Sequence, residues 1–126
     1  MVIKLGNTPK TFKKSVVKFP MPDGSNGVIN AVFKYRTRTQ FGEFLNTVFA
    51  DAGEKAPEGE TPDFEKLFAA TKDKNADHLI LALDSWDVDA ELTLDSLKLL
   101  SNEIPAASIA LMEAYNNACT QGKLGN

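Results

Sequence analysis

Residues 28–36 read Val-Ile-Asn-Ala-Val-Phe-Lys-Tyr-Arg, and the pattern of this stretch decides the class of fold. Apolar or aromatic and polar side chains largely alternate along it. One face carries Ile29, Ala31, Phe33 and Tyr35, the other carries Asn30, Lys34 and Arg36, and Val32 is the exception. A period of two in β-branched and aromatic residues predicts a half-buried β-strand. From Thr37 onward the apolar period becomes that of a helix, so the sequence predicts an α+β fold.

The residues before this stretch predict a second strand that pairs with it. Residues 11–19 are rich in β-forming residues with interspersed lysines, and residues 20–27 read Pro-Met-Pro-Asp-Gly-Ser-Asn-Gly, a dense turn signal. We therefore predict an antiparallel β-hairpin over residues 11–36, preceded by a flexible arm over residues 1–10. Because a lone hairpin is marginal in water, it should lie on the helices or join another sheet.

Residues 37–121 are expected to be the helical part of the chain. Thr37 and Gln40 fit a capping box at the start of the first helix, and Gly53 is well placed to end it. Residues 53–60 are acidic and rich in Gly and Pro, which predicts a flexible linker loop on the surface. The apolar stripe of this first helix consists of Phe41, Phe44, Leu45, Val48, Phe49 and Ala52.

Further helices are expected over residues 61–71, 76–86, 93–104 and 105–121. Thr61, Thr93 and Pro105 provide start signals. Residues 76–86 are apolar nearly all round, so periodicity does not decide their type, but their length and their Leu and Ala content favour a buried helix. The expected architecture is one domain over residues 1–126, with an N-terminal antiparallel β-hairpin followed by a compact bundle of about five α-helices.

Composition indicates an ordinary globular protein with an uneven charge. The 126 residues are 43% hydrophobic and 25% charged, with a net charge of −3. Residues 1–50 carry a net +6 and residues 51–126 a net −9, which marks either an interaction surface or two regions that face water or attract each other. The single cysteine, Cys119, excludes an internal disulfide and fits a reducing cytoplasm. No apolar run approaches the length of a membrane span, so no membrane association is expected.

The residue types that carry chemistry do not form a catalytic or metal-binding pattern. A calcium loop starting at Asp87 would need Gly at its sixth position and Glu at its twelfth, where Leu92 and Lys98 stand. His78 is the only histidine, and we interpret it as a surface or partly buried structural residue, because the adjacent Asp77 does not face it on a helix. No metal, no cofactor and no enzymatic activity are therefore expected.

Trp86 and the basic strand are the candidate contact groups. Trp86, in an acidic turn, is either a core anchor whose indole N–H finds a nearby acceptor or a hot spot that faces a partner. Lys34, Arg36 and Arg38 could pair with nucleic acid, but the pI of about 5.1 argues against this. An acidic protein partner that meets this basic strand flank is the favoured interpretation.

Several blocks of the sequence resemble the small tail assembly chaperones encoded by tailed bacteriophages and prophages. The resemblance covers about residues 30–126. Its blocks are residues 33–41, residues 77–88 with the closing Trp86, the leucines Leu97, Leu99 and Leu100, residues 104–107, Ile109, residues 113–115 with Tyr115, and the terminal residues 122–126.

This resemblance implies a non-enzymatic assembly factor in the host bacterial cytoplasm that is absent from the mature virion. The implied partner is the tail tape measure protein, whose apolar stripes would otherwise aggregate, and the tail tube protein is a second candidate. The alternative is a structural tail component, such as a tail tube or completion protein. The sequence leaves the oligomeric state open.

If the resemblance holds, seven side chains are candidates for the contact. Five are aromatic and are either partner-binding groups or core anchors, and two are arginines that would steer the chain toward an acidic partner, so that reversing their charge should slow association and leave folding intact. These residues are Trp86, Tyr115, Phe41, Phe44, Phe49, Arg36 and Arg38.

Overall fold

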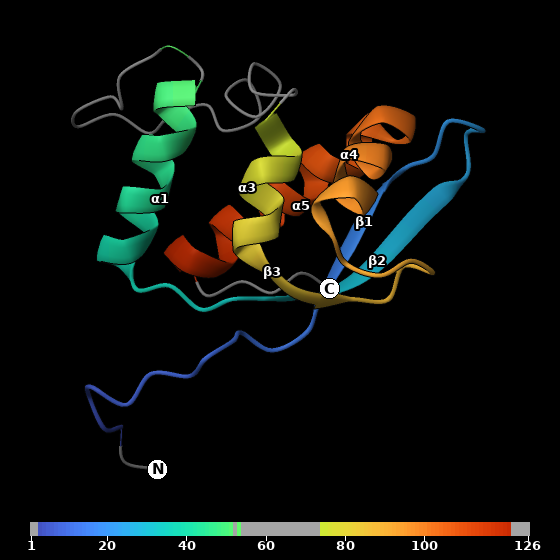
Figure 1. The fold of residues 1–126 in the computed structure, drawn as a ribbon. Coiled ribbons are helices and arrows are strands. Elements are labelled where there is room, and N and C mark those ends of the chain that lie inside the picture. Colours follow the sequence, from blue (N-terminus) through green and yellow to red (C-terminus); the bar gives the residue numbers. More distant parts are fainter. Residues whose placement is uncertain (1–2, 52, 54–73, 122–126) are drawn as a thin grey trace.

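The computed structural model describes residues 3–51, 53 and 74–121, and all structural statements below concern these residues. They form an α+β fold in which strands and helices follow one another along the chain (Figure 1). The elements are β1 (Ser15–Pro20), β2 (Asn26–Phe33), α1 (Arg38–Asp51), α3 (Asn75–Ala82), β3 (Leu83–Trp86), α4 (Leu94–Glu103) and α5 (Pro105–Gln121).

The N-terminal hairpin is confirmed, with strands shorter than the expected span of residues 11–36. β1 and β2 pair in antiparallel register from Ser15 opposite Ala31 to Pro20 opposite Asn26. The turn is closed by the main-chain N–H of Met21, which donates to the carbonyl of Ser25 at 2.8 Å. Beyond the strands, an isolated bridge joins Thr11 to Lys34 and extends the pairing toward the arm.

The sheet has a third strand, which the sequence analysis assigned to a helix. The prediction of a single helix over residues 76–86 is wrong, because α3 ends at Ala82 and the chain continues as β3 along β2. The carbonyl of Ala82 accepts a hydrogen bond of 2.7 Å from the N–H of Lys34, and the buried Leu83 lies opposite Phe33. Strand β3 therefore forms because it pairs with the main-chain N–H and C=O groups at the edge of β2 that the hairpin leaves open. No local sequence pattern encodes that edge.

The helical part also differs in number from the expected five helices. The described residues contain four α-helices and a sheet of three strands in the order β1-β2-β3. The helix expected over residues 61–71 and nearly all of the linker expected over residues 53–60 lie outside the described residues.

The predicted helix boundaries are confirmed where they rest on capping residues. Gln40 accepts from the N–H of Thr37 at 2.9 Å, and the Thr37 hydroxyl accepts from the N–H of Gln40, which is the expected capping box. The hydroxyl of Thr93 accepts from the N–H of Ser96 at the start of α4, and α5 begins at Pro105. After α1, Gly53 has a φ of +74°, a value that favours glycine.

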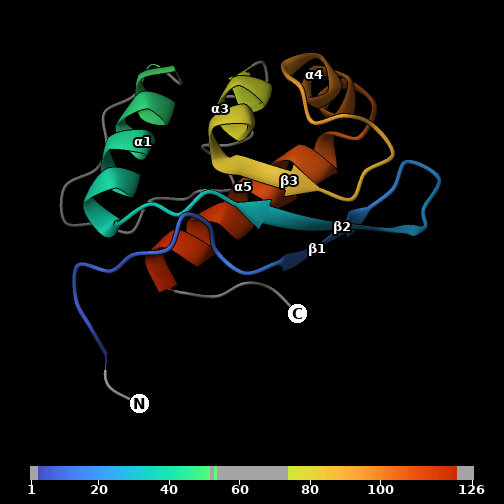
Figure 2. The same cartoon turned by 60° about the horizontal axis from the view of Figure 1, so that its bottom comes forward.

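The helices lie together on one side of the sheet, and the arm before β1 extends away from the body (Figures 1 and 2). Alternate residues of β1 and β2 are buried beneath the helices, whereas the residues between them are more exposed. Helix α5 packs along β1 and also contacts α1, α3 and α4. The largest fully buried side chains are Tyr115, Phe33, Leu79, Leu83, Leu97, Leu111 and Met112.

Candidate functional site

Arg36 lies in the connection between β2 and α1, where its side chain joins three helices. Its Nη1 atom donates to the carbonyl of Leu81 on α3 at 2.9 Å and to the hydroxyl of Tyr115 on α5. The guanidinium carbon also lies 4.9 Å from the centre of the Phe44 ring on α1 and 5.7 Å from that of Tyr115. Hydrogen bonds and cation–π contacts together hold this half-buried cation in place.

A group of aromatic rings surrounds the Arg36 guanidinium. Tyr115 is completely buried, and its ring meets those of Phe41 and Phe44 edge-on at centroid distances of 5.6 and 5.5 Å. Its ring also lies 5.2 Å from Phe33 of β2. The hydroxyl donates to the carbonyl of Lys34 at 3.2 Å, and burial raises the pKa of this phenol. Tyr115 thus combines core packing with a polar contact to the chain that enters α1.

An open cleft of about 670 Å³ lies over this cluster, and we call it the Arg36 cleft. Its lining includes Lys10, Lys34, Arg36, Phe44, Leu81 and Asp84. Glu43 of α1 also lines the cleft, so its lining contains three cationic and two acidic side chains. The side chain of Leu81 is 47% exposed, which places an apolar group of α3 within reach of a partner. The cleft therefore offers an apolar contact next to positive charge.

The structure brings four of the seven candidate residues together and leaves three apart. Arg36, Phe44 and Tyr115 form the cluster beneath the cleft, and the buried Phe41 stacks on Phe44 at 5.9 Å. The other three candidates lie elsewhere: Phe49 is buried further along α1, Arg38 is exposed at the start of that helix, and Trp86 is half-buried on β3.

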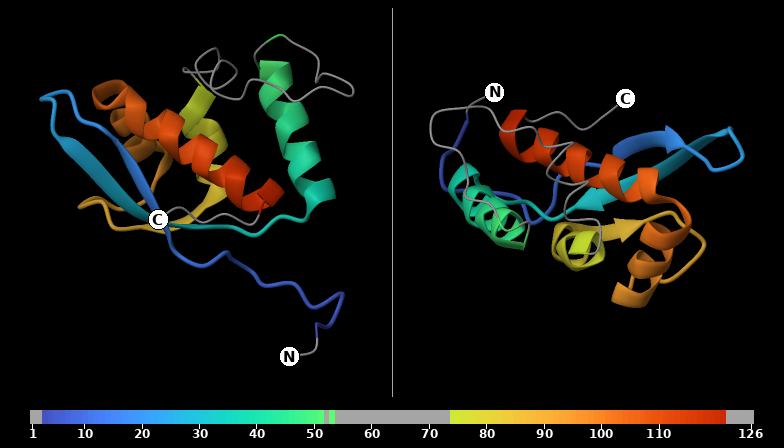
Figure 3. Two further views of the ribbon diagram at one scale, coloured as in Figure 1. Left: turned by 180° about the vertical axis from the view of Figure 1, so that it is seen from behind. Right: turned by 90° about the horizontal axis from the view of Figure 1, so that it is seen from above.

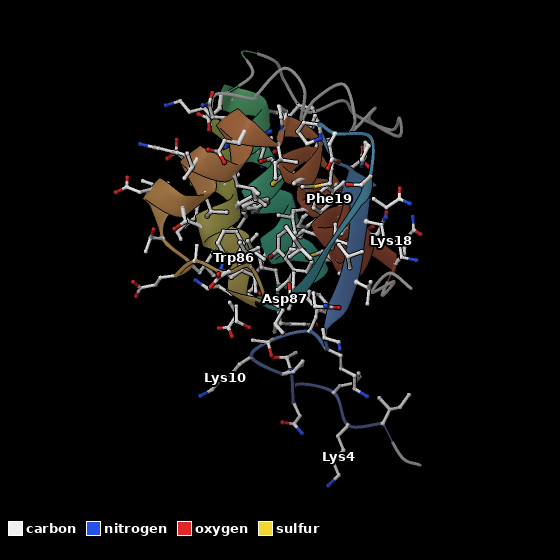
Figure 4. All side chains as sticks on the ribbon, turned by 90° about the vertical axis from the view of Figure 1, so that its right-hand side faces the viewer. Lys4, Lys10, Lys18, Phe19, Trp86 and Asp87 are labelled. Atoms are coloured by element: carbon white, nitrogen blue, oxygen red, sulfur yellow. The ribbon has the colours of Figure 1, made fainter. Side chains whose placement is uncertain are left out.

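Trp86 lies at the end of β3 and is fixed by a contact within its own turn. Its Nε1 atom donates to the carbonyl of Ala90 at 2.9 Å, and its ring packs against the hydrophobic core. Next to it lies Asp87 (Figure 4). Its carboxylate accepts from both the main-chain and the side-chain N–H groups of Asn30, at 2.8 and 2.7 Å. These hydrogen bonds from Asn30 hold the pKa of the Asp87 carboxyl below its ordinary value. The acidic turn thus fastens β3 to β2.

One polar contact of the core joins residues that the sequence analysis did not pair. His78 is 1% exposed, and its Nε2 atom lies 2.6 Å from a carboxylate oxygen of Asp51, the last residue of α1. The sequence expectation of a surface or partly buried histidine is therefore corrected to a buried one. Asp51 is 27 residues away in the chain, so no helical spacing could have indicated the pair.

The described residues contain no group of three His, Cys, Asp or Glu side chains that could hold a metal ion. Burial raises the pKa of the Cys119 thiol to about 11, which keeps it protonated and unreactive at neutral pH. Within the same residues, no helix combines the length and apolar character that crossing a membrane requires.

The comparison with known proteins finds one protein family. The sequence model of the phage tail assembly chaperones matches residues 1–126, the whole chain, and thus also the residues before 30, which the resemblance above does not cover. Neither the curated proteins nor the solved structures give a match.

Proposed function

Because the chain belongs to the phage tail assembly chaperone family, we propose that it binds the tape measure protein during tail morphogenesis. It acts as a non-enzymatic chaperone in the cytoplasm of the host bacterium and is absent from the finished particle. A long helical chain that waits for the tail tube exposes apolar stripes, and such stripes aggregate unless another surface covers them. The tail tube protein is the second candidate partner.

The Arg36 cleft is the observation that carries this proposal. An amphipathic helix binds through apolar side chains laid into a groove, and charges at the rim set its orientation. Here the exposed side chain of Leu81 supplies an apolar contact, and Lys10 and Lys34 supply positive charge beside it. We therefore expect the bound segment to carry acidic residues next to its apolar stripe. A cleft this open and partly polar suits a contact that must later be released.

Two exposed leucines provide a matched test of this site. Leu81 lines the cleft and is 47% exposed, whereas Leu99 lies on α4 and is 56% exposed. Each is replaced by Asp, and each variant is co-expressed with the tape measure protein of the same phage. The wild-type chain and Leu99→Asp should keep the tape measure protein in the supernatant after centrifugation, and Leu81→Asp should not. Circular dichroism of both variants checks that neither replacement has unfolded the chain.

Two outcomes would contradict the proposal at different levels. If the tape measure protein is equally soluble with and without the chain, the chaperone function toward this partner is wrong. If Leu81→Asp protects as well as the wild type, the function stands and the Arg36 cleft is not its site. Mass spectrometry of purified particles tests the alternative of a structural tail component, which would be present there in stoichiometric amount.

A further inference from the structure

Strand β1 is an edge of the sheet, because β2 is its only strand neighbour among the described residues. In an antiparallel pair, opposite residues alternately exchange two main-chain hydrogen bonds or none. The bond from the N–H of Met21 to the carbonyl of Ser25 places the pair Pro20–Asn26 in the second class. Counting back along the register, Val16 and Lys18 belong to the same class. Their N–H and C=O groups therefore point away from β2, toward the free edge.

Two observations agree with this orientation. Asn30, which lies opposite Val16, gives its main-chain N–H to Asp87 on the β3 side of the sheet and not to β1. Pro20 has no N–H to offer, and proline within a sheet is tolerated where its nitrogen faces an open edge. The edge of β1 thus presents the N–H groups of Val16 and Lys18 at the spacing of a strand.

Helix α5 packs against β1 (Figure 3), and a groove lies between the two elements. The groove has a volume of about 340 Å³ and lies between residues 18–20 of β1 and the first half of α5. Its helical wall consists of the small or apolar residues Ala106, Ile109 and Ala110, with Glu113 beyond them. Small side chains in the wall allow another backbone to approach the edge, and Ile109 gives its alternate side chains an apolar surface to contact.

The charge around the edge decides which kind of chain fits it. Residues 3–20 contain five lysines and no acidic residue, and all five lysine side chains are exposed. Figure 4 shows Lys18 on the outer side of the sheet, whereas Phe19 lies on the inner side, beneath the helices. Lysines on an edge repel other basic strands and so select the partner as well as prevent aggregation. The arm of a second copy, with Lys4 and Lys10, carries the wrong charge for this position.

We propose that the β1 edge and the α5 groove bind an extended, acidic segment of a protein partner, which adds to the sheet as a fourth strand. The main-chain groups of Val16 and Lys18 provide the pairing, and alternate side chains of the segment lie over Ala106, Ile109 and Ala110. Lys18, which lines the groove, attracts the acidic side chains. This surface is separate from the Arg36 cleft, so the chain can hold a helical and an extended segment at the same time.

The test uses the full-length chain and a synthetic peptide of about six residues, the usual length of a strand, that alternates Glu and Val and has blocked ends. Amide hydrogen exchange followed by NMR should slow at Val16 and Lys18 when the peptide is bound, by about tenfold or more. A second peptide with Lys in place of Glu should bind at least about tenfold more weakly. Exchange that slows elsewhere, equal binding of both peptides, or no binding of the acidic one would each overturn the proposal.

Replacements of Lys18 separate the contribution of its main-chain N–H to peptide binding from the contribution of its charge. Lys18→Pro removes an N–H that the pairing with β2 does not use, and Lys18→Ala removes the charge and keeps the N–H. Lys18→Pro should weaken peptide binding by about a further fivefold to tenfold relative to Lys18→Ala, the effect of one main-chain hydrogen bond. Equal affinities of these two variants would show that no strand is added.

A second variant keeps the test decisive if Lys18→Pro does not fold. Ala110→Arg fills the groove from the helix side and should abolish peptide binding, whereas Leu99→Arg on α4 should leave it unchanged.

Two further results would show that the edge binds something other than an acidic segment of a protein partner. Dimers in analytical ultracentrifugation that Ala110→Arg disrupts would make the edge an interface between copies, and displacement of the peptide by a short single-stranded DNA would make it a nucleic-acid site.

Discussion

The hydroxyl of Tyr115 on α5 accepts a hydrogen bond from Arg36, a residue 79 positions earlier in the chain, and donates one to the carbonyl of Lys34. Both partners belong to the short connection between β2 and α1, which enters the helical part at this point. The last helix thereby fixes the position at which the sheet ends and the first helix begins. Because Tyr115 is fully buried, water takes the place of its hydroxyl less easily than it would at the surface.

Removing that hydroxyl should destabilise the fold without emptying the core. Tyr115→Phe keeps the ring and leaves two polar groups short of a partner, so the free energy of unfolding should fall by about 1–2 kcal/mol. Urea unfolding followed by the fluorescence of Trp86, the single tryptophan, measures it. Tyr35→Phe, on a half-buried ring that packs against Phe12, is the matched control and should change this free energy by less than about 0.5 kcal/mol.

The two candidate steering arginines should behave differently from each other. Arg38 is exposed, so Arg38→Glu should slow association with an acidic partner and leave the free energy of unfolding nearly unchanged. Arg36 is held by Leu81 and Tyr115, so Arg36→Glu should lower that free energy by more than about 2 kcal/mol. Stopped-flow binding and urea unfolding of both variants provide the measurements. Equal stabilities of the two variants would show that the contacts of Arg36 contribute little.

The contact between Asp51 and His78 should stabilise the packing of α1 against α3. Asp51→Ala leaves the buried Nε2 atom of His78 without this partner, so the free energy of unfolding should fall by about 1–3 kcal/mol. Asp77→Ala removes an exposed carboxylate that lies 4.0 Å from Lys74 and should change it by less than about 0.5 kcal/mol. Thermal unfolding of both variants at one pH compares them, and similar losses would contradict a specific role of Asp51.

Two glycines should respond in opposite directions to replacement by alanine. At Gly27 an added Cβ atom would overlap the Phe19 ring and lie 2.7 Å from Sδ of Met21, so Gly27→Ala should destabilise by about 1–3 kcal/mol. At Gly42, within α1, a Cβ atom meets nothing within 4 Å, so Gly42→Ala should stabilise by about 0.5–1 kcal/mol. Urea midpoints of both variants test the pair, and a stabilised Gly27→Ala variant would show that Phe19 moves aside freely.

Cys119 should make the stability of the chain fall at high pH. Burial raises the pKa of its thiol from 9.0 to about 11, so the unfolded chain ionises there before the folded one does. The stabilisation is complete below pH 9 and is lost as the pH rises to about 11, because ionisation then favours the unfolded state. Cys119→Ala should show a shallower fall over this window, measured by urea unfolding at several pH values. Some slope should remain, since burial also raises the pKa of Tyr115.

Local signals explain which parts of the fold were predictable. The capping box of Thr37 and Gln40, the cap at Thr93 and the start of α5 at Pro105 each depend on residues within one helical turn, and all three are confirmed. The alternation in residues 28–36 depends only on neighbours along one strand, and that strand is present as β2, ending at Phe33. The match of the whole chain to the family confirms the resemblance drawn from residues 30–126.

The candidate site was predictable only as a set of residue types. Arg36, Phe41, Phe44 and Tyr115 were all named from the sequence, but their convergence depends on where α5 crosses the end of β2. From the sequence alone Arg36 is expected to be a free charge, since the carbonyl of Leu81 that accepts its hydrogen bond lies 45 residues away. The contact of Asp51 with His78 was missed for the same reason.

The sequence by itself determined the class of fold, the hairpin and the places where its capped helices begin, because these depend on side chains that are close neighbours in the chain. Only the tertiary structure decided that residues 83–86 leave the helix and become β3. The open edge of β2 offers hydrogen bonds to these residues, and no sequence signal near Leu83 indicates that edge. The tertiary structure also decided that the half-buried Arg36 guanidinium contacts three helices, α1, α3 and α5. A side chain such as that of Arg36 can donate its hydrogen bonds either to water or to a carbonyl that is distant in the sequence. The packing of the helices determines which of these acceptors lies within reach.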